Sequence, residues 1–187
     1  LNKFKEKQIK YNLKLFFNTK TKMVSISKRI PSKIMFTNNY PYRSSMSKTM
    51  QNSFYKLSVE IKKKFNPKKI LEIGSNDGAL IKNFNKKAVI GVEPCKNLAQ
   101  ITKKMGYSTY NNYWTHPLAK KIKIKNEKID LIYSANTLTH ISNLNEVFKS
   151  ITHLLSNNGI LIIEDPSLLE CIRKNSYDQF YNEHIYL

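Results

Sequence analysis

Acidic side chains and glycines occur together in one short stretch, Leu71 to Gly78, with the sequence LEIGSNDG. An apolar run leads there into a turn, and Gly74 and Gly78 let the backbone bend tightly and approach a ligand, as in nucleotide-binding loops. Glu93 ends the next apolar run, about 20 residues after the glycines, where such folds bind a ribose through a carboxylate. The pattern predicts a nucleotide-like cofactor with Glu93 on its ribose. The alternative is that the glycines only form a turn and Glu72 is a capped surface carboxylate.

The residues between the two glycines distinguish two classes of cofactor. A dinucleotide needs G-x-G-x-x-G to hold its pyrophosphate, whereas here the glycines flank Ser-Asn-Asp, and an acidic loop repels phosphate. S-adenosyl-L-methionine has no phosphate and carries an ammonium and a sulfonium, which suit the carboxylates of Glu72 and Asp77. The loop therefore favours S-adenosyl-L-methionine.

The elements that must position this loop follow from the hydrophobic pattern. From Lys69 onward, short apolar runs typical of buried strands alternate with helical segments. Because strands that alternate with helices form a parallel sheet with right-handed crossovers, the sequence predicts a Rossmann-like α/β fold. The predicted strands are Ile70–Ile73, Ala88–Val92, an edge strand at Tyr107–Tyr110, Ile129–Tyr133 and Ile160–Ile163. The predicted helices are one that begins near Asp77 and covers Leu80–Phe84, then Leu98–Met105, Pro117–Ile124 and Leu144–Leu155.

The chain divides into three predicted parts. Residues 1–34 are rich in Lys, show only weak apolar periodicity and are expected to be poorly ordered. Residues 35–67 form an irregular linker and then a helix, which Ser47 can cap and whose apolar positions recur every three or four residues up to Phe65. Residues 68–187 form the predicted cofactor-binding domain.

The composition indicates a folded, cytoplasmic protein. With 187 residues, 41% hydrophobic residues and only five Gly and six Pro, the chain can build one full core. Cys95 and Cys171 lie far apart and no CxxC occurs, which excludes a disulfide framework and a zinc ribbon and favours a reducing compartment. No apolar run approaches the roughly 20 residues that cross a bilayer, so no membrane association is expected.

The net charge of +19 first suggests a nucleic-acid-binding protein. However, residues 1–34 alone hold ten Lys or Arg against one Glu, and 29 of the 32 basic residues in the chain are Lys. Recognition of bases and phosphates favours the Arg guanidinium instead. Together with 21 Asn, this balance favours an AT-rich coding bias over a polyanion-binding surface, and nucleic acid is not the expected partner. A basic rim would also suit a sugar nucleotide, so the charge does not decide the substrate.

Six segments together resemble one enzyme family. They are YPYRSSMSKT (Tyr40–Thr49), LEIGSNDGALIKNF (Leu71–Phe84), GVEPCKNLA (Gly91–Ala99), DLIYSANTLTHISNL (Asp130–Leu144), NNGILIIEDPSLLE (Asn157–Glu170) and YDQFYNEHIY (Tyr177–Tyr186). On these segments the chain from about residue 23 to 187 resembles the class I S-adenosylmethionine-dependent methyltransferases, and within them the C-methyltransferases that act on nucleotide-linked keto-deoxyhexoses. The resemblance implies a role in deoxysugar biosynthesis, with a nucleotide sugar as the small-molecule substrate.

The resemblance also implies roles for individual residues. The methionine part of the cofactor would be surrounded by Glu72, Gly74, Asn76, Asp77 and Gly78, the ribose bound by Glu93, the methyl-transfer cleft lined by Asn136 and His140, and the site closed from the N-terminal side by Tyr42, Ser44 and Ser45. Without the resemblance, His140 would equally be a helix-capping or partly buried imidazole, and residues 42–45 a surface turn.

Catalysis is expected in the segment from Tyr181 to His184. A new carbon–carbon bond requires removal of a proton next to a ketone, and imidazole has a suitable pKa for the base. By resemblance, His184 is the base, Tyr181 donates a hydrogen bond to the developing enolate oxygen, and Glu183 orients the imidazole. On the residue pattern alone, a Tyr, a Glu and a His near the end of the chain would be surface residues.

The sequence departs from the family pattern at both ends. Family members commonly carry an N-terminal zinc module, but if Met23–Ile26 matches the strand that follows it, the cysteine positions fall on Asn18 and Thr21, so no metal site is expected. Asn182 stands where the family usually has His. The family also has further strands and a substrate domain after Ile160–Ile163, so the chain is expected to be a fragment, and its oligomeric state is not indicated. The other interpretations are an O- or N-methyltransferase, an inactive remnant, and a basic nucleic-acid-associated protein.

Overall fold

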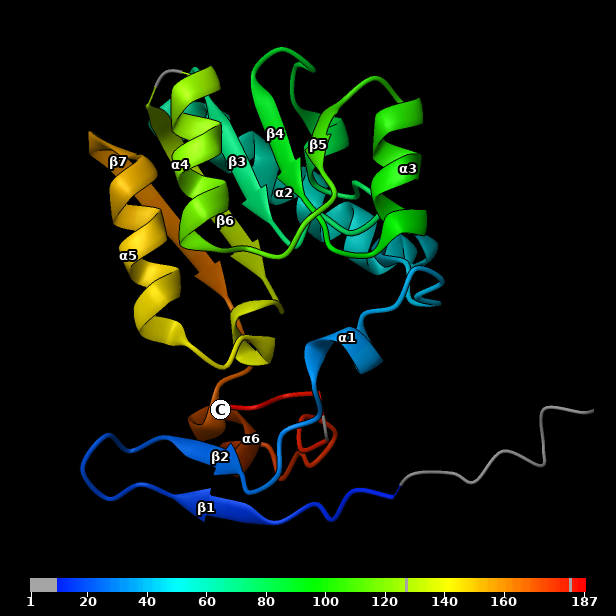
Figure 1. The fold of residues 1–187 in the computed structure, drawn as a ribbon, viewed down its shortest axis with the longest axis vertical. Coiled ribbons are helices and arrows are strands. Elements are labelled where there is room, and N and C mark those ends of the chain that lie inside the picture. The colour runs from blue at the N-terminus through cyan, green and yellow to red at the C-terminus, as the bar shows by residue number, and fades with distance from the viewer. Residues whose placement is uncertain (1–9, 127, 182) are drawn as a thin grey trace, which may run out of the picture.

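A five-stranded parallel sheet forms the centre of the molecule (Figure 1). The computed structural model describes residues 10–126, 128–181 and 183–187. The strand order is β5-β4-β3-β6-β7, and every neighbouring pair is parallel. The strands are β3 (Ile70–Ile73), β4 (Val89–Val92), β5 (Ser108–Tyr110), β6 (Ile129–Ala135) and β7 (Leu155–Glu164). The predicted Rossmann-like α/β class, with its edge strand β5, is therefore confirmed.

Helices cover both faces of this sheet and complete the core. One apolar cluster joins the sheet to α4 (His116–Lys125) and α5 (Leu144–Leu154). The other joins the opposite face to α2 (Lys48–Phe65) and to the short 3₁₀ turn η3 (Ile81–Asn83). A further helix, α3 (Lys96–Lys104), packs beside β4 and β5. Because both faces are covered, β3 and β4 are buried along their whole length, as the apolar runs in the sequence predict.

The helix α2 begins and ends at the predicted residues. The Ser47 hydroxyl accepts a hydrogen bond from the Met50 amide at 3.3 Å and so caps α2. Asn66, with φ of 42°, adopts the left-handed conformation that ends the helix.

No described helix is long and apolar enough to span a membrane.

One predicted helix is wrong. The segment that was expected to be helical from near Asp77 through Leu80–Phe84 contains only the single 3₁₀ turn of η3. Residues 79–81 are all buried against the sheet, so three consecutive side chains point into the core, whereas a longer amphipathic helix would confine its apolar residues to one face. The Asn83 amide also donates to the carbonyls of Ala79 and Leu80 at 3.1 Å each, which satisfies these groups without a further helical turn.

Part of the N-terminal segment is ordered, which differs from the expectation for residues 1–34. The strands β1 (Leu15–Phe17) and β2 (Val24–Ile26) pair as an antiparallel hairpin, followed by the short helix α1 (Ser32–Met35). The backbone of β2 also pairs with the end of the chain, since Val24 and Leu187 exchange two hydrogen bonds of 2.9–3.0 Å. Residues 1–9 lie outside the described part, and the division of the chain into three parts remains a prediction.

Candidate active site

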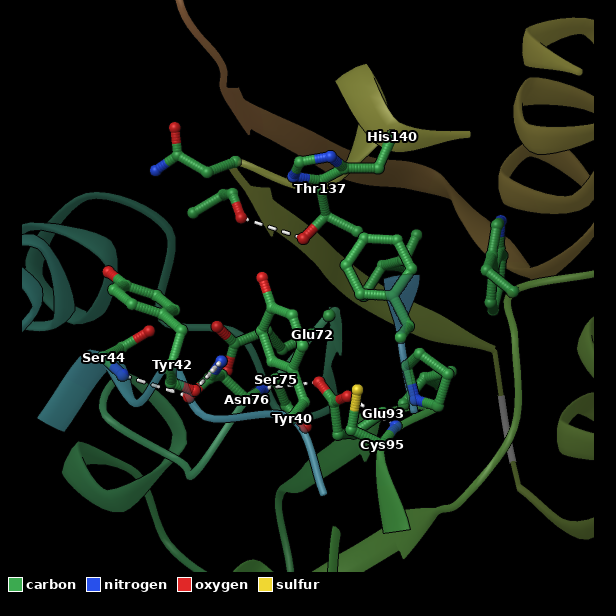
Figure 2. Close-up of a pocket in the computed structure, with 18 of the residues that line it drawn as sticks. Tyr40, Tyr42, Ser44, Glu72, Ser75, Asn76, Glu93, Cys95, Thr137 and His140 are labelled. Atoms are coloured by element: carbon green, nitrogen blue, oxygen red, sulfur yellow. Dashed lines mark hydrogen bonds between the residues drawn. The ribbon is translucent and has the colours of Figure 1, made fainter. Parts of the chain in front are cut away.

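A cavity of about 470 Å³ lies at the carboxyl ends of β3, β4 and β6, where open α/β sheets bind ligands (Figure 2). Its other sides are closed by residues between Ser32 and Ser44 and by residues close to the end of the chain, which are Gln179, Tyr181, Glu183 and His184. Its lining includes eleven of the predicted site residues: Tyr42, Ser44, Glu72, Gly74, Asn76, Glu93, Asn136, His140, Tyr181, Glu183 and His184. The other three, Ser45, Asp77 and Gly78, are not part of the lining.

The loop after β3 has the tight backbone that its glycines predict. Gly74 has φ of +76° and Gly78 of +87°, a region that L side chains rarely adopt. A Cβ at Gly74 would lie 2.1 Å from the Thr137 hydroxyl oxygen, so the loop after β6 packs directly on this glycine. The loop between the two glycines thus has a fixed path along the cavity.

Glu72 places a buried carboxylate without a described partner at the cavity wall. The residue is 3% exposed, and its Oε2 atom has no hydrogen-bond partner among the described residues. Burial, followed by the nearby charges of Glu93 and Asp77, raises the pKa of Glu72 well above its ordinary value. A buried carboxylate of this kind is stabilised when a cation enters the cavity, because the cation replaces the lost hydration.

Glu93 is held at the end of β4 by two backbone amides. Its Oε2 accepts from the Asn76 amide at 2.9 Å and its Oε1 from the Cys95 amide at 2.8 Å. Burial raises the pKa of Glu93, while these hydrogen bonds oppose that effect. Each carboxylate oxygen keeps a free acceptor position, so the pair can bind two neighbouring hydroxyls such as those of a ribose.

Two predicted residues that do not line the cavity, Ser45 and Asp77, connect the segment before α2 to the loop after β3. The Asp77 carboxylate accepts from the Ser45 amide at 3.1 Å and from the Ser45 hydroxyl at 2.5 Å. Beside this pair, the Asn76 side chain accepts from the Ser44 amide at 3.0 Å (Figure 2). Asp77 and Ser45 therefore bind each other across the two segments rather than facing the cavity as the resemblance implies.

The opposite wall carries an imidazole in a defined tautomer. His184 Nδ1 lies 2.9 Å from the Gln179 carbonyl oxygen, which can only accept, so Nδ1 carries the proton. Nε2, 2.8 Å from the Tyr181 hydroxyl, then accepts its hydrogen bond. Burial and the neighbouring His140 lower the pKa of His184, so the ring is neutral near pH 7 and Nε2 can take up a proton.

Glu183 has partners other than the one expected. Its carboxylate accepts from the Tyr40 hydroxyl at 3.1 Å, and its backbone carbonyl oxygen lies 2.7 Å from His140 Nδ1. Burial and Glu183 raise the pKa of Tyr40, which keeps this phenol protonated as the donor. The His184 imidazole is oriented by the Gln179 carbonyl instead, so Glu183 does not have the orienting contact that the resemblance implies.

The structure adds residues to the site that the sequence did not single out. Tyr40, Cys95, Thr137 and Gln179 all line the cavity. Tyr40 lies two residues before the predicted Tyr42, and Cys95 two residues after Glu93, so their place in the quoted segments was a usable signal. Gln179 acts through its backbone carbonyl, and no side-chain pattern could have identified it.

The charge in the cavity is opposite to that of the whole chain. Glu72, Glu93 and Glu183 line it, whereas no Lys or Arg in the described ranges does, although the net charge is +19. A cavity of this kind suits a cationic ligand and has no described cation for a pyrophosphate. Among the described residues, no cluster of three or more His, Cys, Asp or Glu could hold a metal ion. Asn182, where the family usually has His, lies outside the described part.

Comparison with known proteins identifies relatives of this chain. C-methyltransferase NovU of Streptomyces niveus is 30% identical over 117 residues, which cover 62% of this chain and 28% of NovU. The chain thus spans less than a third of that relative. The plantazolicin methyltransferase BpumL, solved with a pentazolic desmethylPZN analog and SAH, superposes with a TM-score of 0.55 at 17% identity over 82% of this chain and 61% of BpumL. The plantazolicin methyltransferase BamL gives 0.54 at 18% identity over 73% of this chain and 56% of BamL.

The family assignment rests on a match between the sequence and a family, not on these relatives. The sequence pattern of the family described as methyltransferase domain matches residues 42–187, which is most of the chain and includes every predicted site residue. The cofactor expected from the loop, S-adenosyl-L-methionine, agrees with this family and with the fold. The chain therefore belongs to the methyltransferase domain family and has the fold of the class I S-adenosylmethionine-dependent methyltransferases.

Proposed function

We propose that the cavity binds S-adenosyl-L-methionine and that the protein transfers its methyl group to a carbon atom of a nucleotide-linked keto-deoxysugar. The observation that carries the first half is the buried carboxylate of Glu72, whose Oε2 has no described partner, beside the ribose-binding geometry of Glu93. The residues fit this cofactor, because its ammonium and sulfonium would compensate the acidic cavity and its ribose hydroxyls match the free acceptor positions of Glu93. When bound, the cofactor supplies an electrophilic methyl group.

The second half rests on His184 and Tyr181. A neutral imidazole with its unprotonated Nε2 in the cavity is suited to remove a proton from the carbon next to a ketone. The proton goes to Nε2, and the C–H electron pair forms the enolate. With the cofactor bound, the enolate carbon would take the methyl group, and the S–C electron pair would stay on sulfur, so that the cofactor would leave as the neutral thioether. Tyr181 is 40% exposed as a residue, and as the substrate enters, its hydroxyl exchanges its His184 acceptor for the developing enolate oxygen. His184 Nε2 is then free to accept the proton.

The likeness to NovU supports a carbon acceptor, because that relative is named a C-methyltransferase. An O- or N-methyltransferase whose acceptor is already nucleophilic would not need to form a carbanion, and it would leave the base at His184 without a task. A small-molecule substrate is also consistent with a cavity of about 470 Å³. The nucleotide-sugar class remains part of the proposal, with the sugar in the cavity and the diphosphate outside its described lining, which holds no Lys or Arg.

The proposal is tested first by calorimetric titration with S-adenosyl-L-methionine. The wild-type chain should bind the cofactor, and Glu72→Gln and Glu93→Ala should each weaken binding by about 1–3 kcal/mol, the usual loss for a buried charge-assisted hydrogen bond. Glu60→Ala is the matched control, because Glu60 is an exposed carboxylate on α2 that does not line the cavity. Equal affinity in wild type, Glu72→Gln and Glu93→Ala would reject the assigned cofactor site, and no binding by wild type would reject the proposed cofactor.

A further inference from the structure

Asp165, directly after β7, binds the loop that follows β6. Its carboxylate accepts a hydrogen bond from the Thr137 amide at 3.1 Å, and the backbone of Thr139 also donates to it. One residue earlier, the Glu164 carbonyl accepts from the Asn136 amide at 2.7 Å. The end of β7 thus fixes the backbone of the whole loop from Asn136 to Thr139.

The same loop holds the segment that carries the proposed base. The Thr139 carbonyl accepts from the Ile185 amide at 2.7 Å. His140 Nδ1 lies 2.7 Å from the Glu183 carbonyl, and the His140 ring packs at 5.0 Å from the ring of His184. The loop therefore contacts the backbone on both sides of His184.

We propose that Asp165 is a positioning residue, whose carboxylate sets the path of the Asn136–His140 loop and through it the place of the His184 imidazole. This inference rests on the proposed function, because it concerns the reaction assigned to His184. Asp165 does not line the cavity and has no assigned role in cofactor or substrate binding. Asp165 contacts the Asn136–His140 loop, and this loop contacts the segment that carries His184.

The surroundings of Asp165 make this role sensitive to pH. Burial raises the pKa of Asp165 to about 6, the neighbouring Glu164 adds to the effect, and the hydrogen bonds from Thr137 and Thr139 oppose it. Tyr133 on β6 donates to Glu164, and the charge of Asp165 contributes to the raised pKa of this tyrosine. The charged residues of the following helix α6 (Leu168–Arg173) pair with one another, since Glu170 binds both Arg173 and Lys174.

Ionisation of Asp165 has opposite effects on the order of the loop and on the stability of the fold. A carboxyl group whose pKa is raised from 3.8 to about 6 favours the folded state in its protonated form, so the free energy of unfolding decreases as pH rises from about 4 through 6. The charged form, in contrast, makes the stronger hydrogen bonds to Thr137 and Thr139. Ionised Asp165 therefore orders the loop while it weakens the fold.

The test compares wild type with Asp165→Asn, which keeps the shape and one acceptor oxygen but removes the charge. At pH 7.5 the variant should melt at the same or a higher temperature and bind S-adenosyl-L-methionine within about threefold of wild type. Its kcat for methyl transfer should fall about 10–100-fold, as expected when a base is displaced by a fraction of an ångström to an ångström. The part of the wild-type decrease in kcat near pH 6 that follows Asp165 should be absent in the variant, which keeps only the decrease that protonation of His184 causes at lower pH. Glu170→Gln, which changes an exposed carboxylate on α6, is the control and should match wild type.

A second measurement keeps the inference testable if methyl transfer is not observed. Amide hydrogen-exchange protection factors at Thr137, Thr139 and Ile185 should rise in wild type as pH increases through about 6, and should be flat in Asp165→Asn. Flat protection in wild type would overturn the role of Asp165 whatever the reaction is. If the protection factors change with pH in wild type but no methyl transfer is observed, the proposed function is rejected and the role of Asp165 in ordering the loop is kept. Lower stability with an unchanged kcat in Asp165→Asn would show a purely structural residue.

Discussion

The tautomer of the His184 imidazole is set by a backbone carbonyl rather than by an acidic side chain. The Gln179 carbonyl fixes the proton on Nδ1, and burial keeps the ring neutral. A carboxylate in that position would instead raise the pKa of the ring and favour the protonated form. The arrangement therefore favours a ring that accepts a proton on Nε2 and releases it readily.

We expect His184→Ala to abolish exchange of the substrate's α-proton with deuterated water, because this step needs only the base. The loss of a general base costs about 10²–10⁴-fold, and Tyr181→Phe should slow the exchange less, since it removes only a hydrogen bond to the enolate. Exchange is measured by NMR with a nucleotide-linked keto-deoxysugar. The control is His153→Ala on α5, because His153 is not part of the cavity lining. Unchanged exchange in His184→Ala would move the base elsewhere, with His140 the next candidate.

Single residues differ in how far the sequence could predict their place. Gly74 and Glu93 were predictable, because backbone conformation and the end of an apolar strand are local properties that the sequence carries directly. The partners of Asp77 and Glu183 were not, since Ser45 and Tyr40 lie 32 and 143 residues away along the chain. Contacts at such separations depend on how the segments pack, which no local pattern records.

At the scale of the elements, the loop after β3 packs directly against the loop after β6. Gly74 and Thr137 approach so closely that a Cβ at Gly74 would overlap the Thr137 side chain. The Thr137 hydroxyl is itself fixed by a hydrogen bond to the Ala135 carbonyl at 2.9 Å. The loop after β3 and the loop that leads to His140 are thus one packed unit.

We expect Gly74→Ala to destabilise the fold through two separable effects. The left-handed φ costs an alanine about 1–2 kcal/mol, and the overlap with Thr137 adds to this. In Gly74→Ala/Thr137→Ala the overlap is relieved and only the backbone cost and the lost Thr137 hydrogen bond remain. Urea denaturation of the four chains should give a favourable coupling of about 1 kcal/mol or more between the two sites. Additive effects would show that the contact does not constrain the loops.

The pattern of elements was largely predictable, and the exception shows why. Strands such as Ile70–Ile73 and helices such as α2 follow from periodicity and caps, which depend on residues close in sequence. The segment Leu80–Phe84 has the apolar content of a helix, but Leu80, Ile81 and Phe84 pack into the apolar cluster on one face of the sheet, and only a single 3₁₀ turn forms. This packing is a tertiary property, and it overrides local propensity there.

At the scale of the whole molecule, the two ends of the described chain are joined beside the site. Strand β2 pairs with residues 185–187 by backbone hydrogen bonds, and Ser25 and Tyr186 form an isolated antiparallel bridge. The proposed base precedes this pairing by one residue. The cofactor half of the cavity, in contrast, is built from the sheet and from the contacts of Ser44 and Ser45 with the β3 loop. The N-terminal hairpin therefore supports one half of the site only.

We expect removal of residues 1–28, which deletes β1 and β2, to affect the two halves of the site differently. The Leu187 amide donates to the Val24 carbonyl of β2, so it should lose its protection from hydrogen exchange when this acceptor is removed. Proton abstraction by His184 should fall about 10-fold or more, because its segment is held on one side only. Binding of S-adenosyl-L-methionine should stay within about threefold of wild type, since Glu72, Glu93 and the Ser45–Asp77 contact are retained. That retained binding also shows that the shortened chain is folded.

The control for this deletion is removal of residues 1–9 alone, which keeps both strands of the hairpin. It should match wild type in cofactor binding, in exchange protection and in proton abstraction. Equal loss of cofactor binding and proton abstraction in the longer deletion would mean that the hairpin stabilises the whole fold. Unchanged proton abstraction would mean that the contacts of the β6 loop, from Thr139 to Ile185 and from His140 to Glu183, are sufficient to hold the base. Because Asp165 orders that same loop, the 1–28 deletion combined with Asp165→Asn should lose more proton abstraction than the two single changes predict together.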